Sequence, residues 1–184
     1  TITCVGQLRQ WGTAIQMYSN DQNGYAPYQK DNNTSWNVNT ELMFNYLNLK
    51  SPQGDRSKAP PPKISRCPSQ DTSTFTAYWD ISYGENCYFS GPVSTTGYTP
   101  IKITVAYQPS KTMLLSDWFQ RTAYPSGYYT SITNQYLIAR HNKSLNISYL
   151  DGHTATIKKN AMDIYCSNMK LSPWYDIFWQ GHKK

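Results

Sequence analysis

The chain has 184 residues, of which 39% are hydrophobic and only 15% are charged, so it has room for one domain with a substantial core. Its polarity comes from Asn, Ser, Thr, Gln and 16 Tyr, a composition typical of an exported, strand-rich protein. The net charge is +6, but the basic residues are scattered along the sequence, which argues against a specific nucleic-acid interface.

The first segment predicts an amphipathic helix. Its apolar side chains recur at steps of four and three residues and form one stripe: Cys4, Leu8, Trp11, Ile15 and Tyr18. We expect the helix to end between residues 20 and 24, where Asp, Asn and Gly gather and Pro27 follows. No apolar stretch approaches the roughly 20 residues that a membrane-spanning helix needs.

A second, shorter helix is expected over residues 40–49, with Asn39 or Thr40 capping its first turn. Its apolar face would consist of Leu42, Met43, Tyr46 and Leu47. Residues 51–63 hold Pro52, Gly54 and three consecutive prolines, and this pattern predicts an extended surface loop.

From residue 64 onward the pattern changes to that of β-strands. Segments rich in Tyr, Ile, Thr and Val, separated by turn residues, lie at 78–89, 101–107, 112–118, 135–141, 145–150 and 154–158. Residues 142–144 and the pair Asp151-Gly152 fit tight turns, so we expect an antiparallel meander. Two short helical pieces are expected in the tail, starting near Asn160 and Ser172. The sequence therefore predicts an α+β fold, with an N-terminal amphipathic helix packed on an antiparallel sheet.

Four cysteines are present, at positions 4, 67, 87 and 166, and none of them has Cys-x-x-Cys spacing. If the protein is exported, one or two disulfides are expected, and three pairings exist if all four cysteines bond. We favour Cys67 with Cys87 because of their shared β context and their separation. Cys4 with Cys67 is nearly as good, and buried free thiols remain an alternative.

Several motifs, taken in order, carry a resemblance to a known family. The stretch at 4–27 reads CVGQLRQWGTAIQMYSNDQNGYAP, and the stretch at 140–153 reads RHNKSLNISYLDGH, in which nine residues separate His141 from Asp151-Gly152. Between them stand Cys67-Pro68-Ser69, then Ser82-Tyr83-Gly84 with Asn86, and then Asp117 after an apolar strand. Together these resemble the bacterial prepilin-like (pseudopilin) proteins with a C-terminal His-x9-Asp-Gly segment.

The resemblance implies a pilin-like architecture and an assembly role. In that family a long N-terminal helix begins as an apolar membrane anchor and continues as an amphipathic half packed on a sheet head. Residues 1–24 would be this second half, followed by the helix and Pro-rich loop at 25–63, the sheet at 64–159 and a helical tail at 160–184. The anchor half would lie upstream of Thr1. The implied partners are other pilin-like subunits and the inner membrane, and the implied location is extracytoplasmic, at the periplasm or cell surface.

A set of carboxylates and imidazoles is a candidate metal site: Asp117, His141, Asp151 and His153. The alternative is structural: Asp151-Gly152 would form a turn whose carboxylate accepts backbone amide hydrogens, and His141 would bond across strand ends. Calcium is a further candidate ligand near Asp21 and Asn23. The loop has only one carboxylate, which argues against a calcium site. We expect no resident cofactor.

No nucleophile motif and no phosphate-binding glycine loop is present, so we expect a protein that is not an enzyme. A metal-dependent enzyme would require the four candidate metal ligands to converge in a cleft. Tyr124, Tyr128 and Tyr129 surround Pro125 and Gly127, and they are our candidate contact surface. They support a second hypothesis, an exported surface-binding module that takes glycan or another polymer.

Overall fold

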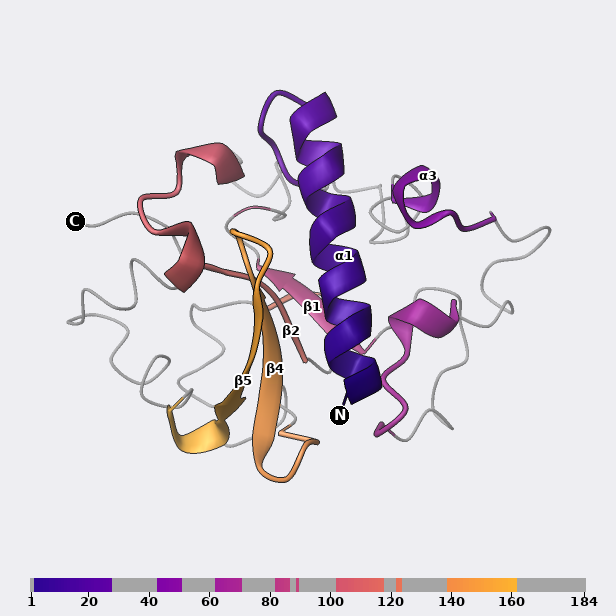
Figure 1. Cartoon of the computed structure of the whole chain (residues 1–184), viewed down its shortest axis with the longest axis vertical. Helices are drawn as coiled ribbons and strands as arrows, with labels where there is room; N and C mark the ends of the chain where they lie inside the picture. The colour runs from indigo at the N-terminus through magenta and orange to yellow at the C-terminus, as the bar shows by residue number, and fades with distance from the viewer. Residues whose placement is uncertain are drawn as a thin grey trace.

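One long helix laid along an antiparallel sheet forms the framework of the protein, as the computed structural model shows (Figure 1). The structure describes residues 2–27, 43–50, 62–70, 82–86, 89, 102–117, 122–123 and 139–161. Its helix-and-sheet framework is the α+β arrangement expected from the sequence. The hydrophobic core includes residues from Cys4 near the N-terminus to Leu150 at the end of the sheet.

Helix α1 (Ile2–Asp21) carries the expected apolar stripe on its buried face. Buried on it are Cys4, Leu8, Trp11, Gly12, Ala14, Ile15, Tyr18 and Ser19. The helix ends where the Asp, Asn and Gly residues gather, because Asn23 and Gly24 adopt positive φ angles of 54° and 90°. The amide of Gly24 then donates a hydrogen bond of 2.8 Å to the carbonyl of Ser19, which satisfies one of the last helical carbonyls. Among the described residues, no helix has the length and hydropathy needed to cross a membrane.

The sheet has the strand order β3-β1-β2-β4-β5. Its strands are β1 (Tyr83–Asn86), β2 (Met113–Asp117), β3 (Thr122–Ala123), β4 (Ser144–Tyr149) and β5 (Thr154–Lys158). Four of them pair in antiparallel fashion, while the two-residue β3 pairs in parallel with β1 at the edge. All residues of β2 and β4 are buried, so these two strands form the centre of the fold.

Both predicted turns of the meander are present. Asn142 and Lys143 have φ angles of 52° and 56°, and the flanking residues exchange two backbone hydrogen bonds, as in a two-residue hairpin. Gly152 has a φ of 89° in the turn that joins β4 to β5, a value that L side chains rarely adopt. These two turns fix the positions of His141 before β4 and of Asp151 after it.

Four sequence predictions need correction or lie outside the described residues. Residues 101–107 were expected to form a strand, but Ile103–Val105 form a short 3-10 helix because backbone bonds there close locally, from Ala106 to Ile103. In place of a helix over 40–49, the described part holds only α3 (Phe44–Leu47), which ends at Asn48 in a left-handed conformation. The Pro-rich segment 51–61 and the tail 162–184 lie outside the described residues.

Helix α1 runs beside β4 and in the same direction, and it is attached to neighbouring elements along its length. Near the middle, Gly12 lies so close to Ser148 that a Cβ atom on the glycine would stand 2.5 Å from the serine oxygen. Near the C-terminal end, the Gln16 amide donates a hydrogen bond of 2.7 Å to the carbonyl of Leu150, just after β4. On the side of α1 away from the sheet, the Tyr46 hydroxyl on α3 donates to Asp21 at 2.8 Å.

Candidate functional site

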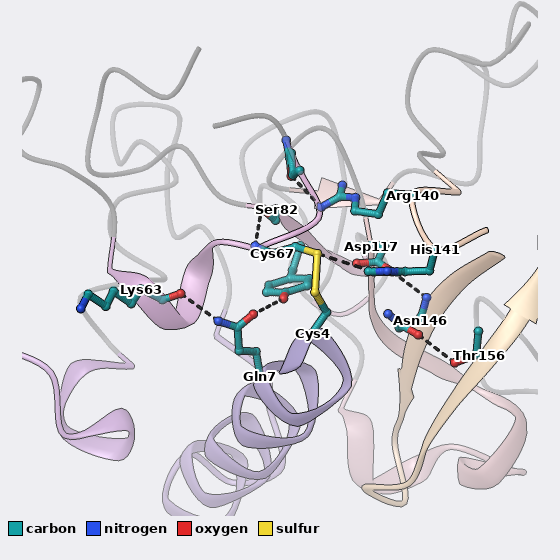
Figure 2. The surroundings of a disulfide bond; sticks show 12 residues. Cys4, Gln7, Lys63, Cys67, Ser82, Asp117, Arg140, His141, Asn146 and Thr156 are labelled. Carbon is teal, nitrogen blue, oxygen red and sulfur yellow. Dashed lines mark hydrogen bonds and ion pairs between the residues drawn. A yellow bond between two sulfur atoms is a disulfide. The ribbon is translucent and has the colours of Figure 1, made fainter. Parts of the chain in front are cut away.

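A disulfide joins the first turn of α1 to the segment that follows the 3-10 helix η1 (Lys63–Ser65). It connects Cys4 and Cys67, whose Cα atoms are 5.3 Å apart and whose side chains are fully buried (Figure 2). This pairing replaces the one favoured from sequence, since Cys67 cannot also be bonded to Cys87, which lies outside the described residues. The physical reason is that Cys4 belongs to the buried stripe, so docking of the helix brings it to Cys67.

His141 and Asp117 lie next to this disulfide (Figure 2). The His141 Nε2 atom is 3.5 Å from the Cys67 sulfur and 3.2 Å from Asp117 Oδ2. The side chains of His141 and Asp117 are only 1% and 0% exposed. We refer to Cys4, Cys67, Asp117 and His141 as the buried cluster. Its members come from four separate parts of the chain: α1, the segment after η1, the end of β2 and the turn before β4.

Hydrogen bonds hold Asp117 and Cys67 of the buried cluster, and residues beside the cluster, in place. The Asn146 backbone amide donates to Asp117 Oδ2 at 2.7 Å, and the Cys67 amide donates to the Ser82 hydroxyl at 2.8 Å. On the helix side, the Tyr83 hydroxyl donates to Gln7 Oε1 at 2.6 Å, and the Gln7 amide donates to the Lys63 carbonyl at 2.9 Å. The surroundings of the cluster are therefore ordered by several independent contacts.

Burial dominates the electrostatics of the buried cluster. It raises the pKa of Asp117 above its ordinary value, although the Asn146 amide, Arg140 and His141 all act in the opposite direction. It lowers the pKa of His141, and here Asp117 acts in the opposite direction. It also raises the pKa of the Tyr83 hydroxyl, a shift to which the Asp117 charge adds. Each shift favours the uncharged form, so His141 carries a neutral imidazole near neutral pH.

The buried cluster is not arranged as a nucleophilic triad. In a triad one imidazole nitrogen faces the nucleophile and the other faces the carboxylate. Here the same atom, Nε2, faces both the sulfur and Asp117, while Nδ1 has no hydrogen-bond partner among the described residues. The Cys67 sulfur is bonded to Cys4 as well. The geometry therefore suits fastening, or binding of an ion, better than acid–base relay.

The structure separates the four residues that the sequence suggested as one metal site. Asp117 and His141 meet at the start of β4, whereas Asp151 and His153 pair at its far end, at 2.5 Å between Oδ1 and Nδ1. Because β4 has six residues, the two pairs are about 20 Å apart. His153 is exposed and its ring stacks on Tyr149 at 4.3 Å. The four side chains cannot share one ion.

A different set of ligand atoms does converge. The sulfurs of Cys4 and Cys67 and a ring nitrogen of His141 all lie within 4.8 Å of one another. The sequence analysis missed this set because 74 positions separate Cys67 from His141. The signals that were available were the position of Cys4 on the buried stripe of the helix and Cys67 as one of its possible disulfide partners.

The other candidate residues either lie outside the described residues or belong to the end of α1. Tyr124, Tyr128 and Tyr129 lie outside the described residues. Asp21, considered for calcium, accepts the Tyr46 hydrogen bond at the helix end, and Asn23 has the positive φ of a helix-ending turn. Comparison of the chain with family models, with curated proteins and with solved structures finds no match.

Proposed function

We propose that this chain is the head of a pilin-like structural subunit, a pseudopilin of a secretion or pilus-like apparatus, which assembles through an apolar helix upstream of Thr1. The observation that carries the proposal is the way α1 is attached to the rest of the head. A disulfide fixes its first turn, and hydrogen bonds follow at intervals toward its last turn. The role proposed is mechanical and not catalytic.

In a subunit assembled through its helix, force along the helix has to reach the head. Three side chains of α1 donate hydrogen bonds to backbone carbonyls of other elements: Gln7 to Lys63, Trp11 to Ile64, and Gln16 to Leu150. The Cys4–Cys67 bond lies at the N-terminal end, where pulling by an upstream segment would act first. Covalent attachment at that end prevents the helix from peeling off the sheet one turn at a time.

The outer face of α1 offers a surface for neighbouring subunits. Its exposed residues include Thr3, Gly6, Arg9, Thr13 and Met17, which are small or polar except for Met17, whose side chain is 49% exposed. At the start of the helix, Ile2 is 90% exposed. An apolar side chain at this point is what an apolar helical segment continuing upstream would present. The sequence resemblance to prepilin-like proteins and the disulfide, which suggests an extracytoplasmic location, support the same proposal.

The decisive test is to determine the codons upstream of Thr1 and the N-terminus of the mature protein by mass spectrometry. The proposal expects a peptidase site, a Glu a few residues after it, and about 20 apolar residues that lead into α1. An ordinary secretory signal cleaved just before Thr1 would contradict it. The exported surface-binding module would then become the better hypothesis.

A second test examines assembly directly, with the full-length protein in its native membrane. Thr13→Cys on the exposed face of α1 should form cross-linked dimers within assembled subunits. Val105→Cys is the matched control, because Val105 is 64% exposed but lies outside the helix. Equal cross-linking of the two variants, or none with either, would count against assembly through the helix.

A further inference from the structure

The buried cluster has the composition of a zinc site. Thiolate, imidazole and carboxylate are the protein ligands of Zn²⁺, which prefers four of them in a tetrahedron. Cys4, Cys67 and His141 bring their ligand atoms within 4.8 Å of one another, and Asp117 Oδ2 lies 3.2 Å from the His141 nitrogen. The cluster therefore contains four potential ligands, although two of its sulfurs are joined in the disulfide.

Two of the distances match edges of such a tetrahedron. With ordinary zinc–ligand bond lengths, a sulfur and a nitrogen bound to one zinc lie about 3.6 Å apart, and a nitrogen and an oxygen about 3.4 Å apart. The corresponding distances are 3.5 Å from Cys67 Sγ to His141 Nε2 and 3.2 Å from His141 Nε2 to Asp117 Oδ2. Once the disulfide is open, rotation of the cysteine side chains would have to bring the two sulfurs to about 3.8 Å from each other and to about 3.6 Å from Asp117 Oδ2, because the carboxylate does not belong to the set of ligand atoms that lie within 4.8 Å of one another.

Charge and hydrogen bonding around the cluster suit a bound cation. The charges would balance: two thiolates and one carboxylate face Zn²⁺, and the guanidinium of Arg140 acts on Asp117 from nearby. The Asn146 amide, which donates to Asp117 Oδ2, would orient the carboxylate as outer hydrogen bonds usually do at metal sites.

We propose that, when the Cys4–Cys67 disulfide is reduced, the buried cluster binds one zinc ion through two thiolates, the His141 imidazole and the Asp117 carboxylate. Reduction by a dithiol transfers two electrons and two protons to the protein disulfide and leaves the reductant as a cyclic disulfide. Zinc binding then releases to solvent the two thiol protons and the proton that lies between His141 Nε2 and Asp117 Oδ2. The ion takes the place between Nε2 and Oδ2 that a proton holds in the oxidised protein.

Disulfide and zinc are thus mutually exclusive ways to tie the same elements together. In the oxidised chain a covalent bond joins α1 to the segment after η1. In the reduced chain the ion joins these two and also the ends of β2 and of the turn before β4. The helix stays attached to the sheet in both redox states, and an oxidant that forms the disulfide expels the metal.

The test uses the full chain with Cys87→Ser and Cys166→Ser, so that only the two cluster thiols remain. The protein is reduced with a dithiol, freed of reductant without air, and titrated with Co²⁺ as a spectroscopic probe and then with Zn²⁺. We expect one Co²⁺ per chain, with the sulfur-to-cobalt charge-transfer and visible bands of a tetrahedral thiolate site, and displacement by Zn²⁺. The oxidised chain should show none of these bands.

Variants separate a built site from chelation by two loose thiols. His141→Ala should weaken Co²⁺ binding more than about 100-fold and Asp117→Asn by about 10- to 100-fold, with altered visible bands. The double variant Asp151→Asn, His153→Ala is the matched control and should bind Co²⁺ unchanged, because that pair lies at the other end of β4. Unchanged binding by His141→Ala, or absence of thiolate–cobalt bands in the reduced parent, overturns the proposal.

Folding provides a readout that is independent of the probe. If reduction lowers the melting temperature, Zn²⁺ should raise it again in the reduced parent and leave the oxidised chain unchanged, because an ion that binds only the folded state stabilises it. His141→Ala should lose most of this zinc-dependent shift. A reduced parent that melts at the same temperature with and without Zn²⁺ also contradicts the site.

Discussion

Two aspartate–histidine pairs stand at opposite ends of β4, one buried and one exposed. Asp117 and His141 are at most 1% exposed and lie against a disulfide, while the Asp151 and His153 side chains are 36% and 45% exposed in a surface turn. The residue types are the same and both contacts are short. What differs is the dielectric environment and the number of elements that depend on each pair.

The comparison indicates that burial, more than residue type, determines how much such a pair contributes to the stability of the fold. In water, an ion pair gains little because solvent screens it and the side chains lose rotamer freedom. In the core, removal of one partner leaves a polar group that nothing else can satisfy. The buried pair should therefore contribute far more to the stability of the fold than the exposed pair.

The largest difference between the two ends should come from the disulfide. Cys4→Ser should lower the free energy of unfolding by about 4 kcal/mol, the chain-entropy value for a loop of this size. The loop spans 63 positions. Urea unfolding under oxidising conditions measures the loss. A reductant should destabilise the parent but not Cys4→Ser, and equal sensitivity of both proteins to it would show that another bond is responsible.

The two pairs can be compared directly by removing one carboxylate from each. Asp117→Ala should cost about 3 kcal/mol, because it leaves buried His141 and the Asn146 amide without their partner. Asp151→Ala should cost less than about 0.5 kcal/mol, since its contact is exposed. Chemical denaturation of both variants gives the two values. Similar losses would mean that burial does not distinguish the pairs.

Helix α1 contains one glycine that is packed against the sheet and one that has open space around it. Gly12→Leu should destabilise by about 2 kcal/mol, because the side chain would overlap Ser148 and push the helix from the sheet. Gly6 has nothing within 4 Å of its missing Cβ, so Gly6→Leu should stabilise by about 0.5 kcal/mol through helix propensity. Thermal melting distinguishes them, and a stabilising Gly12→Leu would refute the close helix–strand contact.

A smaller effect than that of Gly12→Leu is expected at the turn that carries the exposed pair. Gly152→Ala should cost about 1 kcal/mol because its φ of 89° is unfavourable for an L side chain. Gly152→Asn should cost less, since asparagine tolerates positive φ better. Urea unfolding measures both variants. If alanine and asparagine are equally tolerated, the turn does not hold this conformation in solution.

Local patterns in the sequence predicted the elements with strong periodicity or turn residues. The stripe from Cys4 to Tyr18, the end of the helix near Gly24 and the turn at Gly152 are as expected, because each depends on residues close in sequence. Residues 101–107 have β-rich composition, yet Ile103–Val105 close local hydrogen bonds and form a 3-10 helix. Composition alone does not predict the long-range β-bridge between Tyr25 and Lys102, which immediately precedes this 3-10 helix.

The site was less predictable because it is built from long-range contacts. Cys4 meets Cys67 only because the helix docks on the segment after η1, and His141 joins them from a third part of the chain. The sequence left two interpretations of the motif that contains His141, Asp151 and Gly152, a structural turn and one metal site, and the strand between its two ends holds the candidate ligands apart. Sequence spacing within a hairpin does not show whether its two ends face the same cluster.

The parallel course of α1 and β4 makes their lengths interdependent. From Cys4 to Gln16 the helix advances about 18 Å, at about 1.5 Å per residue. From Ser144 to Leu150 the strand advances about 20 Å, at about 3.3 Å per residue. Deletion of one residue within this part of the helix would turn every later side chain by about 100° and move Gln16 away from Leu150. The segment between the two attachment points therefore tolerates substitutions far better than insertions or deletions, and any lengthening of the helix belongs before Cys4.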